Sequence, residues 1–414
     1  MKTKFVRAAF AAALMSTAAA VATTPAMAAD KISPAVQKPL AEAAKDMQAK
    51  DYQSALTAVQ AAQAVPDQTP YDTYMVNKFL SIVEINLKDT VAATKPAEDA
   101  ADSPAMPDED KKDMLHNALL LASNAKDYAK VIVYGQKLDQ MNLLDDQGAA
   151  MVAVAFYDQK DMTNAKLYAQ KSIDLAKTAG KQPNEAALQI IMSSQAATDQ
   201  GAAEGTLEQI VATYSRPEDW DKLVGVSLGT KGLSNADALN MYRLLYIQGP
   251  MLTGDDYTYM GGLAEAQRNY VEARNVLQAG ISSGKLSGSA DLNKVRGEAA
   301  SDEKIIDQAI SAAAKSKKGE DDMQIAQDLW GYGRYADVES FATAAKAKGG
   351  IKDPGEANVL IGMAQIAQGK YDAGIATLGQ VSGNAARMRT AHLWTIYAQA
   401  KQKAGSTAAP APAH

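Results

Sequence analysis

The sequence contains no cysteine among its 414 residues. This absence excludes disulfide bonds and thiolate metal ligands, and it leaves no cysteine at a leader cleavage site to which a lipid could be attached. Aromatic residues are scarce, with five phenylalanines and three tryptophans, whereas alanine dominates the apolar residues. Because strands favour β-branched and aromatic residues while closely packed helices accept alanine, this balance disfavours a sheet and favours an all-α fold.

Residues suited to catalysis or metal binding are also few. Only His116 and His392 lie in the part of the chain expected to be ordered, and neither stands at a metal-ligand spacing or beside a partner for general-base chemistry. The stretch Gly331-Tyr332-Gly333-Arg334 has the glycines of a phosphate loop, but it follows a helical pattern and lacks a closing Gly-Lys-Ser. We therefore expect no catalytic, cofactor-binding or metal-binding residues.

The first 28 residues have the pattern of a secretory signal peptide. Lys2, Lys4 and Arg7 precede the short apolar run Ala8–Val21, and Ala26-Met27-Ala28 supplies small residues for cleavage. That run is shorter than the roughly 20 apolar residues that span a bilayer, and no later segment is long and apolar enough to do so. The pattern predicts a periplasmic protein that begins at Ala29.

The charge of the chain disfavours some partners. The formal net charge is −6, and removal of the leader, with three basic and no acidic residues, takes it to −9. An acidic chain is repelled by phosphate backbones and by anionic membrane surfaces. We therefore expect no nucleic-acid partner.

One pattern recurs along the chain. The stretch Gly355–Val381 contains two apolar-periodic segments joined by Gly369-Lys370-Tyr371, with the small residue Gly374 three positions beyond the tyrosine. Similar turns begin at Lys50, Lys88, Lys126, Lys160, Arg268 and Gly333. Equivalent positions of units that follow one another lie 34 to 38 residues apart. A unit of this size cannot bury its own apolar face, so the copies are expected to stack.

These turns resemble those of the tetratricopeptide repeat family. The last unit carries Ile361-Gly362, Tyr371, Gly374 and Leu378 at the positions of the family pattern. The resemblance implies an α-solenoid of helix-turn-helix repeats in which the turn aromatic packs between the two helices of a unit. With its leader, the chain also resembles exported proteobacterial tetratricopeptide proteins, most clearly from Tyr242 to Leu286 and from Leu360 to Ala398. That likeness implies fold and location but no activity.

The repeat pattern divides the chain into consecutive segments. We expect irregular structure only where proline, glycine, serine or charge accumulates. The predicted segments are a signal peptide at 1–28, N-terminal repeats at 29–95, an acidic proline-containing insertion at 96–110 whose residues 99–110 are mobile, central repeats at 111–285, a polar loop and helix at 286–318, C-terminal repeats at 319–403, and a disordered tail at 404–414.

The resemblance also places side chains on the inner wall of the array. The family positions that line the groove correspond here to Tyr157, Met323, Gln327, Trp330, Glu356, Val359, Met363 and Ile366. The lysine, asparagine and arginine with which family members hold a peptide carboxylate are absent from these positions. Methionine and aromatic side chains suit an apolar or amphipathic segment of a partner. Equally, these side chains could pack against the chain's own next helix or tail, and the sequence leaves both alternatives open.

These observations predict a non-enzymatic periplasmic scaffold that binds a protein or peptide partner in a concave groove. One alternative is a cell-wall-associated enzyme, or an enzyme accessory, with an α-superhelical arm. An enzyme would need a compact catalytic domain, for which no segment outside the repeats is long enough. Another alternative is a structural protein that self-associates through its repeats.

Overall fold

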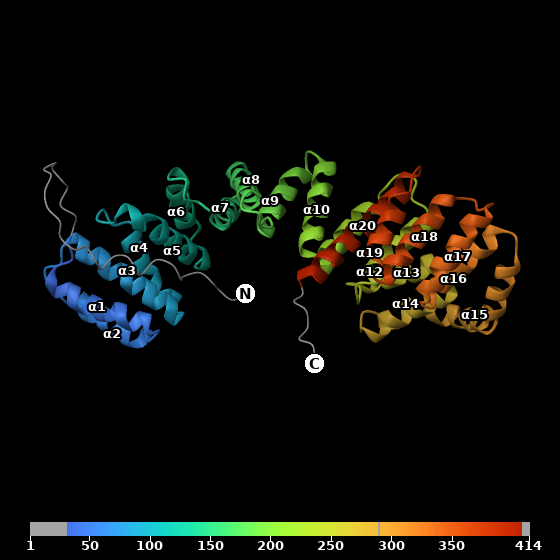
Figure 1. The fold of residues 1–414 in the computed structure, drawn as a ribbon, viewed down its shortest axis with the longest axis horizontal. Coiled ribbons are helices and arrows are strands. Elements are labelled where there is room, and N and C mark those ends of the chain that lie inside the picture. The colour runs from blue at the N-terminus through green and yellow to red at the C-terminus, as the bar shows by residue number, and fades with distance from the viewer. Residues whose placement is uncertain (1–30, 289, 408–414) are drawn as a thin grey trace. The chain divides into compact units, whose positions relative to one another are not determined.

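The computed structural model describes residues 31–288 and 290–407, and these contain twenty α-helices, one 3-10 helix and no strand (Figure 1). The predicted signal peptide and the last residues of the predicted tail, 408–414, lie outside the described residues. The tail was expected to begin at 404, but the last helix continues to Thr407. The all-α fold class predicted from the sequence is confirmed.

The chain divides into two compact units, Met1–Leu144 (unit 1) and Asp145–His414 (unit 2). Unit 1 contains α1 (Pro34–Gln48), α2 (Tyr52–Gln63), α3 (Pro70–Leu87), α4 (Thr90–Ala101), η1 (Asp108–Asp110), α5 (Lys111–Asn124) and α6 (Tyr128–Gln140). Unit 2 contains α7 (Asp146–Asp158), α8 (Met162–Thr178), α9 (Glu185–Ala196), α10 (Gln200–Tyr214), α11 (Pro217–Ser227), α12 (Asn235–Tyr246), α13 (Gly254–Ala266), α14 (Tyr270–Ser282), α15 (Ala290–Lys315), α16 (Gly319–Gly331), α17 (Tyr335–Lys348), α18 (Pro354–Ala367), α19 (Tyr371–Leu378) and α20 (Ala385–Thr407).

All seven predicted turns join the two helices of a packed pair. In each turn the residue before the helix cap has a positive φ, and the next amide donates to a carbonyl five residues back, as Asp51 does to Asp46 at 2.9 Å. This hydrogen bond ends the first helix of the pair. Four aspartates then cap the second helix by accepting from the amide three residues on: Asp51, Asp89, Asp127 and Asp161. The helix pairs with their repeated turn confirm the tetratricopeptide-like architecture.

The two helices of the last pair approach each other at glycines. A Cβ on Gly362 would lie 2.6 Å from Cγ of Leu378, and one on Gly374 would lie 2.5 Å from Cγ1 of Ile366. In this pair the absence of a Cβ at both positions allows the close approach without displacing Leu378 or Ile366. Tyr371, expected to be wedged between the helices, is half-buried and packs at the edge of the apolar core.

The predicted insertion at 96–110 is ordered and packed in the structure. Residues up to Ala101 belong to α4, whose buried face includes Pro96 and Ala100. Asp110 accepts a hydrogen bond from the hydroxyl of Tyr74 at 2.6 Å and forms an ion pair with Lys78 at 2.6 Å. The segment is therefore not an irregular insertion, because alanines at helical spacing continue α4 through its prolines and acids. The mobility of residues 99–110 stays a prediction.

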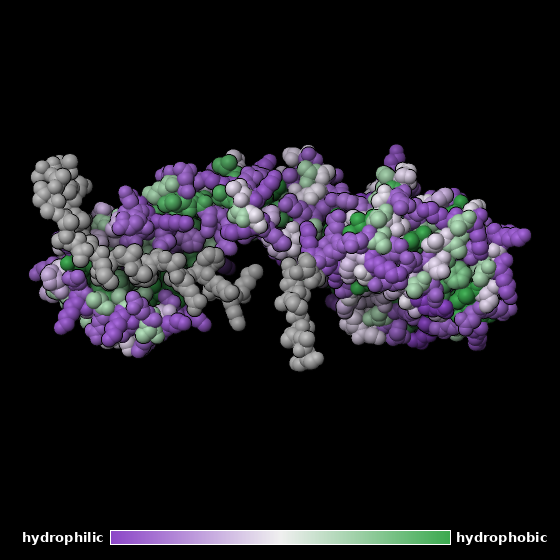
Figure 2. All heavy atoms as spheres, viewed as in Figure 1, coloured by the Kyte–Doolittle hydropathy of each residue, from purple (hydrophilic) through white to green (hydrophobic). Residues whose placement is uncertain are grey.

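One apolar core extends through most of unit 2. Its buried residues run from Leu207 in α10 to Ala398 in α20. Helix α20 follows α19 in sequence, yet it also packs against α10, α12 and α18 (Figure 1). Thus α20 connects helices nearly 200 residues apart, and this part of unit 2 is a closed arrangement. Over the face seen in Figure 2 hydrophilic residues predominate, with hydrophobic residues in small separate patches.

The segment predicted as a polar loop and helix, 286–318, contains the 26-residue helix α15. Its few buried residues, Leu292, Val295, Ala299 and Ala313, attach it to the neighbouring helices. Among the described residues, no helix combines the length and the apolar character needed to cross a lipid bilayer.

Candidate functional site

Seven of the eight predicted groove residues lie on two neighbouring helices of unit 2: Met323, Gln327 and Trp330 on α16, and Glu356, Val359, Met363 and Ile366 on α18. We call these seven residues the inner wall. Its apolar members are enclosed by the protein itself, since Val359 and Met363 are fully buried and the exposed fraction of Trp330 is 6%. Whether the wall contacts a partner stays a prediction, but in this structure its apolar side chains are not open to solvent.

Helix α20 packs into the same core as the inner wall. Trp394 is fully buried, and its ring meets that of Trp330 edge-on at 6.0 Å. Its indole N–H donates to the backbone carbonyl of Asn240 at 2.9 Å. Tyr397, one turn further on, lies edge-on to both Trp394 and Trp220. Of the two alternatives left by the sequence, packing against the chain's own helix describes this part of the wall.

Arg387 attaches the start of α20 to α12 and to α18. Arg387, of which 6% is exposed, pairs with Asp237 in the first turn of α12 at 3.2 Å and with Asp353 at the start of α18. Asp237 also accepts from Ser234 in a capping box, so one carboxylate serves both a helix end and an ion pair. The pair between Arg387 and Asp237 is buried and satisfied, as a charge inside a protein requires.

A second charged cluster joins α20 to α10. Arg389 pairs with Glu204 at 2.5 Å and with Glu208, and its Nε donates to the hydroxyl of Ser227. His392 lies 2.9 Å from Glu208. Burial by itself raises the pKa of Glu208, but hydrogen bonds from His392 and Arg389 outweigh it and lower the pKa to about 2. The carboxylate of Glu208 therefore stays charged over the ordinary pH range.

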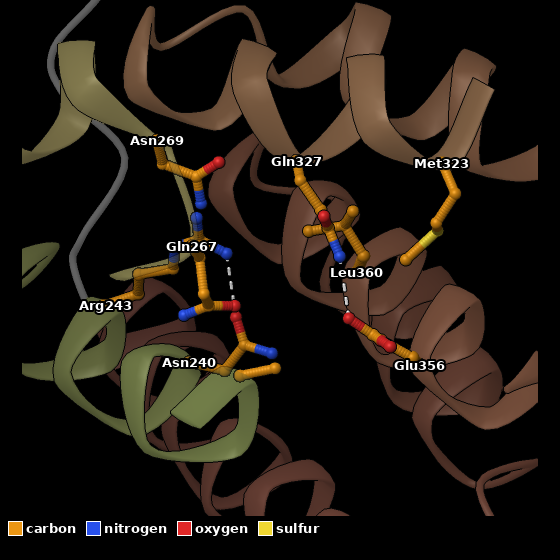
Figure 3. Close-up of a pocket in the computed structure, with 9 residues that line it drawn as sticks. Asn240, Arg243, Gln267, Asn269, Met323, Gln327, Glu356 and Leu360 are labelled. Carbon is orange, nitrogen blue, oxygen red and sulfur yellow. Dashed lines mark hydrogen bonds between the residues drawn. The ribbon is translucent and has the colours of Figure 1, made fainter. Parts of the chain in front are cut away.

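A small pocket with polar walls (the polar pocket) remains beside the inner wall (Figure 3). It has a volume of about 10 Å³, enough for one water molecule. Within it the amide of Gln327 donates to the carboxylate of Glu356 at 2.7 Å. The lining residues are Ala236, Asn240, Arg243, Gln267, Asn269, Met323, Gln327, Glu356 and Leu360. Three of them, Met323, Gln327 and Glu356, were predicted from the sequence.

One side of the polar pocket is a buried ion pair. Arg243 and Glu272 are 3% and 4% exposed and form two parallel bonds, at 2.8 and 2.5 Å. Arg243 also donates to the amide oxygen of Asn240 at 2.8 Å, and its guanidinium lies over the ring of Trp330 at 5.1 Å. Since the charge of Arg243 is neutralised in this way, the pocket offers no free cation to an anionic ligand.

The acceptors of the polar pocket are less well satisfied. Asn269 is 4% exposed, and its side-chain oxygen has no hydrogen-bond partner among the described residues. Asn269 occupies the turn position where four other units carry a capping aspartate, but it does not cap its helix. Burial raises the pKa of Glu356, whose carboxylate accepts from Gln327. The pocket can therefore hold a water or another small donor group.

Tyr157, the eighth predicted residue, is 41% exposed at the end of α7. Gln147 is exposed and Val154 half-buried on the same face of this helix, since the three residues are spaced by seven and three. We call Gln147, Val154 and Tyr157 the α7 stripe. Unlike the inner wall, this stripe keeps an aromatic side chain open to solvent.

Sequence reasoning missed Asn240, Arg243, Gln267 and Asn269, and it missed the whole of α20 as a partner of the inner wall. The only local signal was Asn269, where asparagine replaces the aspartate of the turn pattern. The contacts of Arg387 and Trp394 span about 150 residues of sequence, and no local pattern reveals them. Among the described residues, no cluster of three or more histidines and carboxylates could hold a metal ion.

Comparisons with known proteins add little to this description. No family model and no curated protein matches the chain. The solved structures that match include three of low similarity. A complex of Naa15 and Naa10 bound to HypK is 12% identical with a TM-score of 0.31, over 90% of this chain and 68% of that one.

Two further matches also extend over 90% of this chain. Yeast Tom70 is 10% identical with a TM-score of 0.24, over 97% of its length. The tetratricopeptide domain of P58(IPK) is 13% identical with a TM-score of 0.25, over 99% of its length. At such scores these likenesses support no conclusion about function, and the description of the fold depends on the helix pairs and turns themselves.

Proposed function

We propose that this protein is a non-enzymatic periplasmic scaffold that binds an apolar or amphipathic segment of a protein partner. Stacked helix pairs provide extended faces on which such a segment can lie. The leader pattern of residues 1–28 supports the periplasmic location.

The α7 stripe is the observation that carries the proposal. Tyr157 is a large aromatic side chain left 41% exposed on the first helix of a pair, at a position that lines the groove in the family pattern. Helix α20 covers the inner wall on α16 and α18, but its packing is with α10, α12, α18 and α19 and does not extend to α7. Aromatic anchors of this kind contribute much of the binding energy at protein interfaces.

Photo-crosslinking in intact cells tests the proposal. A photoreactive residue placed at Gln147 should crosslink to the same envelope protein in repeated experiments, and Tyr157→Ala should reduce that product severalfold. Leu167→Ser is the matched control, because Leu167 is 61% exposed on α8 of the same pair and should leave the product unchanged. Equal loss with both variants, or no reproducible product at Gln147, would contradict binding at the α7 stripe.

The location has a separate test. Protein purified from the periplasm of its native host should begin at Ala29 when its N-terminus is determined by mass spectrometry. An intact Met1 on the mature protein would exclude export by a cleaved leader.

A further inference from the structure

The polar pocket has two sides, which come from different helices of unit 2 and face each other in Figure 3. The first, which we call the α12 side, consists of Ala236, Asn240 and Arg243 on α12 and of Gln267 and Asn269 in the turn between α13 and α14. The second, the α16 side, consists of Met323 and Gln327 on α16 and of Glu356 and Leu360 on α18. Each side is hydrogen-bonded within itself, but no hydrogen bond among the described residues joins a lining residue of one side to one of the other.

The α12 side contains a buried acceptor without a donor. Asn269 is 4% exposed, and its side-chain oxygen Oδ1 has no hydrogen-bond partner among the described residues. At the same turn position four other units carry an aspartate that caps the next helix, a bond that Asn269 does not form. Since buried amide oxygens normally accept a hydrogen bond, the donor for Asn269 is expected to come from outside the chain.

The α16 side offers a second acceptor. The carboxylate of Glu356 accepts from the side-chain amide of Gln327 at 2.7 Å and forms no ion pair with a described residue. A carboxylate has about four acceptor positions, so this one bond leaves capacity for another donor. A donor held between Asn269 and Glu356 would therefore join the two sides of the pocket.

Arg243 adds donors to the same pocket. Of its five N–H groups, three donate in the bonds to Glu272, at 2.8 and 2.5 Å, and to Asn240, at 2.8 Å, which leaves two. The occupant thus meets donors as well as acceptors. A cation could accept nothing from Arg243, and an anion could donate nothing to Asn269, whereas a water molecule does both.

The size of the pocket agrees with this chemistry. Its volume of about 10 Å³ takes one water molecule, and a buried water typically forms two to four hydrogen bonds. From this geometry we infer that the polar pocket binds a single water molecule that donates to Asn269 and Glu356 and accepts from Arg243. The water supplies the connection between the α12 and α16 sides that the side chains do not make. This site is separate from the α7 stripe and does not depend on the proposed function.

A crystal structure of the full chain tests the inference directly. The crystals are grown in rubidium bromide, and data are collected at the absorption edges of both ions. We expect density for one atom in the pocket, about 2.5–3.2 Å from Asn269 Oδ1, from the Glu356 carboxylate and from a nitrogen of Arg243, with no anomalous signal. A pocket without density would overturn the inference. An anomalous rubidium signal would assign the site to a cation and a bromide signal to an anion, and either would overturn it as well.

Pulsed X-ray radiolysis tests the site in solution, because hydroxyl radicals formed from a bound water oxidise a neighbouring methionine. Met323 lines the pocket, whereas Met363 is fully buried and outside it, so Met323 should be oxidised severalfold faster. Since Met323 is itself 9% exposed, the deciding variant is Asn269→Leu, which removes the acceptor and should slow oxidation of Met323 severalfold.

The matched control is Asn293→Leu, the same change at an exposed position of α15, which should leave the oxidation rate of Met323 unchanged. An unchanged rate in Asn269→Leu, or equal slowing in both variants, would overturn the inference. Equal rates for Met323 and Met363 in the unchanged protein would also contradict a water bound beside Met323.

Discussion

Replacing Trp394 with alanine tests whether α20 closes the core of unit 2. The side chain is fully buried, meets Trp330 and Tyr397 edge-on and donates to the carbonyl of Asn240. Loss of a large aromatic from a well-packed core costs about 3–5 kcal/mol. We therefore expect the opening equilibrium of this core to rise roughly 150- to 4,500-fold.

The distribution of the effect distinguishes a closed arrangement from a simple linear array. In a linear array each unit touches only its neighbours, so damage in α20 would stay in α18 and α19. Here α20 shares one core with α10 and α12, so amide protection should fall in those helices as well. Hydrogen exchange measured by mass spectrometry on the full chain resolves these helices, and α1 to α4 of unit 1 serve as an internal reference.

Met388→Ala is the control, because Met388 lies on the same helix and is 43% exposed. It should leave protection close to that of the unchanged protein. If Trp394→Ala lowers protection only in α18 to α20, the contact of α20 with α10 and α12 does not contribute to stability. A uniform fall that includes unit 1 would show that the whole chain unfolds as one body.

Three further predictions concern a close helix approach, a charged cluster and the short helix η1. Gly261→Ala should lower the free energy of unfolding by about 1–3 kcal/mol, because a Cβ there would lie 2.8 Å from Cγ of Leu277. At the adjacent Gly262 a Cβ would meet no atom within 4 Å, so Gly262→Ala should raise the free energy of unfolding by about 0.5–1 kcal/mol. Equal melting temperatures for the two variants would refute the close contact of α13 with α14. For Glu208, whose pKa falls from its usual 4.5 to about 2 on folding, stability present above pH 4.5 should be lost as the pH drops toward 2. All three tryptophans lie in the core that Glu208 helps to hold, so their fluorescence should report this acid transition, and Glu208→Gln should flatten it. Asp110→Ala should destabilise unit 1 by about 1–3 kcal/mol by leaving the buried hydroxyl of Tyr74 unpaired. Asp108→Ala, at a side chain that is 90% exposed, is the comparison in urea unfolding, and equal midpoints would restore the view of a dispensable segment.

The turns could be predicted because their determinants are local. In the pair α1 and α2, Lys50 adopts the left-handed conformation, Asp51 caps the next helix, and Ala55 is buried at the contact between the helices. The hydrogen bonds of the turn join residues at most five positions apart, and the contact of Ala55 lies within one helix pair, so the amino-acid pattern of one repeat contains all of them. The same reasoning placed Gly362 and Gly374 at the close approach of the last pair.

The segment 96–110 shows where composition misled. Prolines and acids suggested irregular structure, but Ala93, Ala97 and Ala100 lie on one helical face and are buried. The acids also have specific partners, since Asp102 accepts from Lys137 at 2.7 Å and Asp110 from Tyr74. Those partners lie more than 30 positions away, and composition alone does not identify them.

For the candidate site, the sequence predicted the residues of the inner wall but left open what covers them. It identified Met323, Gln327 and Glu356, which line the polar pocket, because helix-face positions follow from the repeat pattern. Covering the wall depends on α20 reaching α10 and α12, through contacts such as that of Trp394 with Asn240. Whether Trp394 reaches Asn240 depends on the sum of the small rotations that relate each helix pair to the next.

By itself, then, the sequence determined the helix pairs, their turns and the faces they bury, because these follow from hydrogen bonds and apolar spacing within one or two repeats. Only the tertiary structure decided that the C-terminal helix closes the core and that Arg243 and Glu272 form a buried pair. These features join residues 29 to 181 positions apart, or depend on which charges come together in space. The packing of successive pairs sets such distances, and no short stretch of sequence contains it.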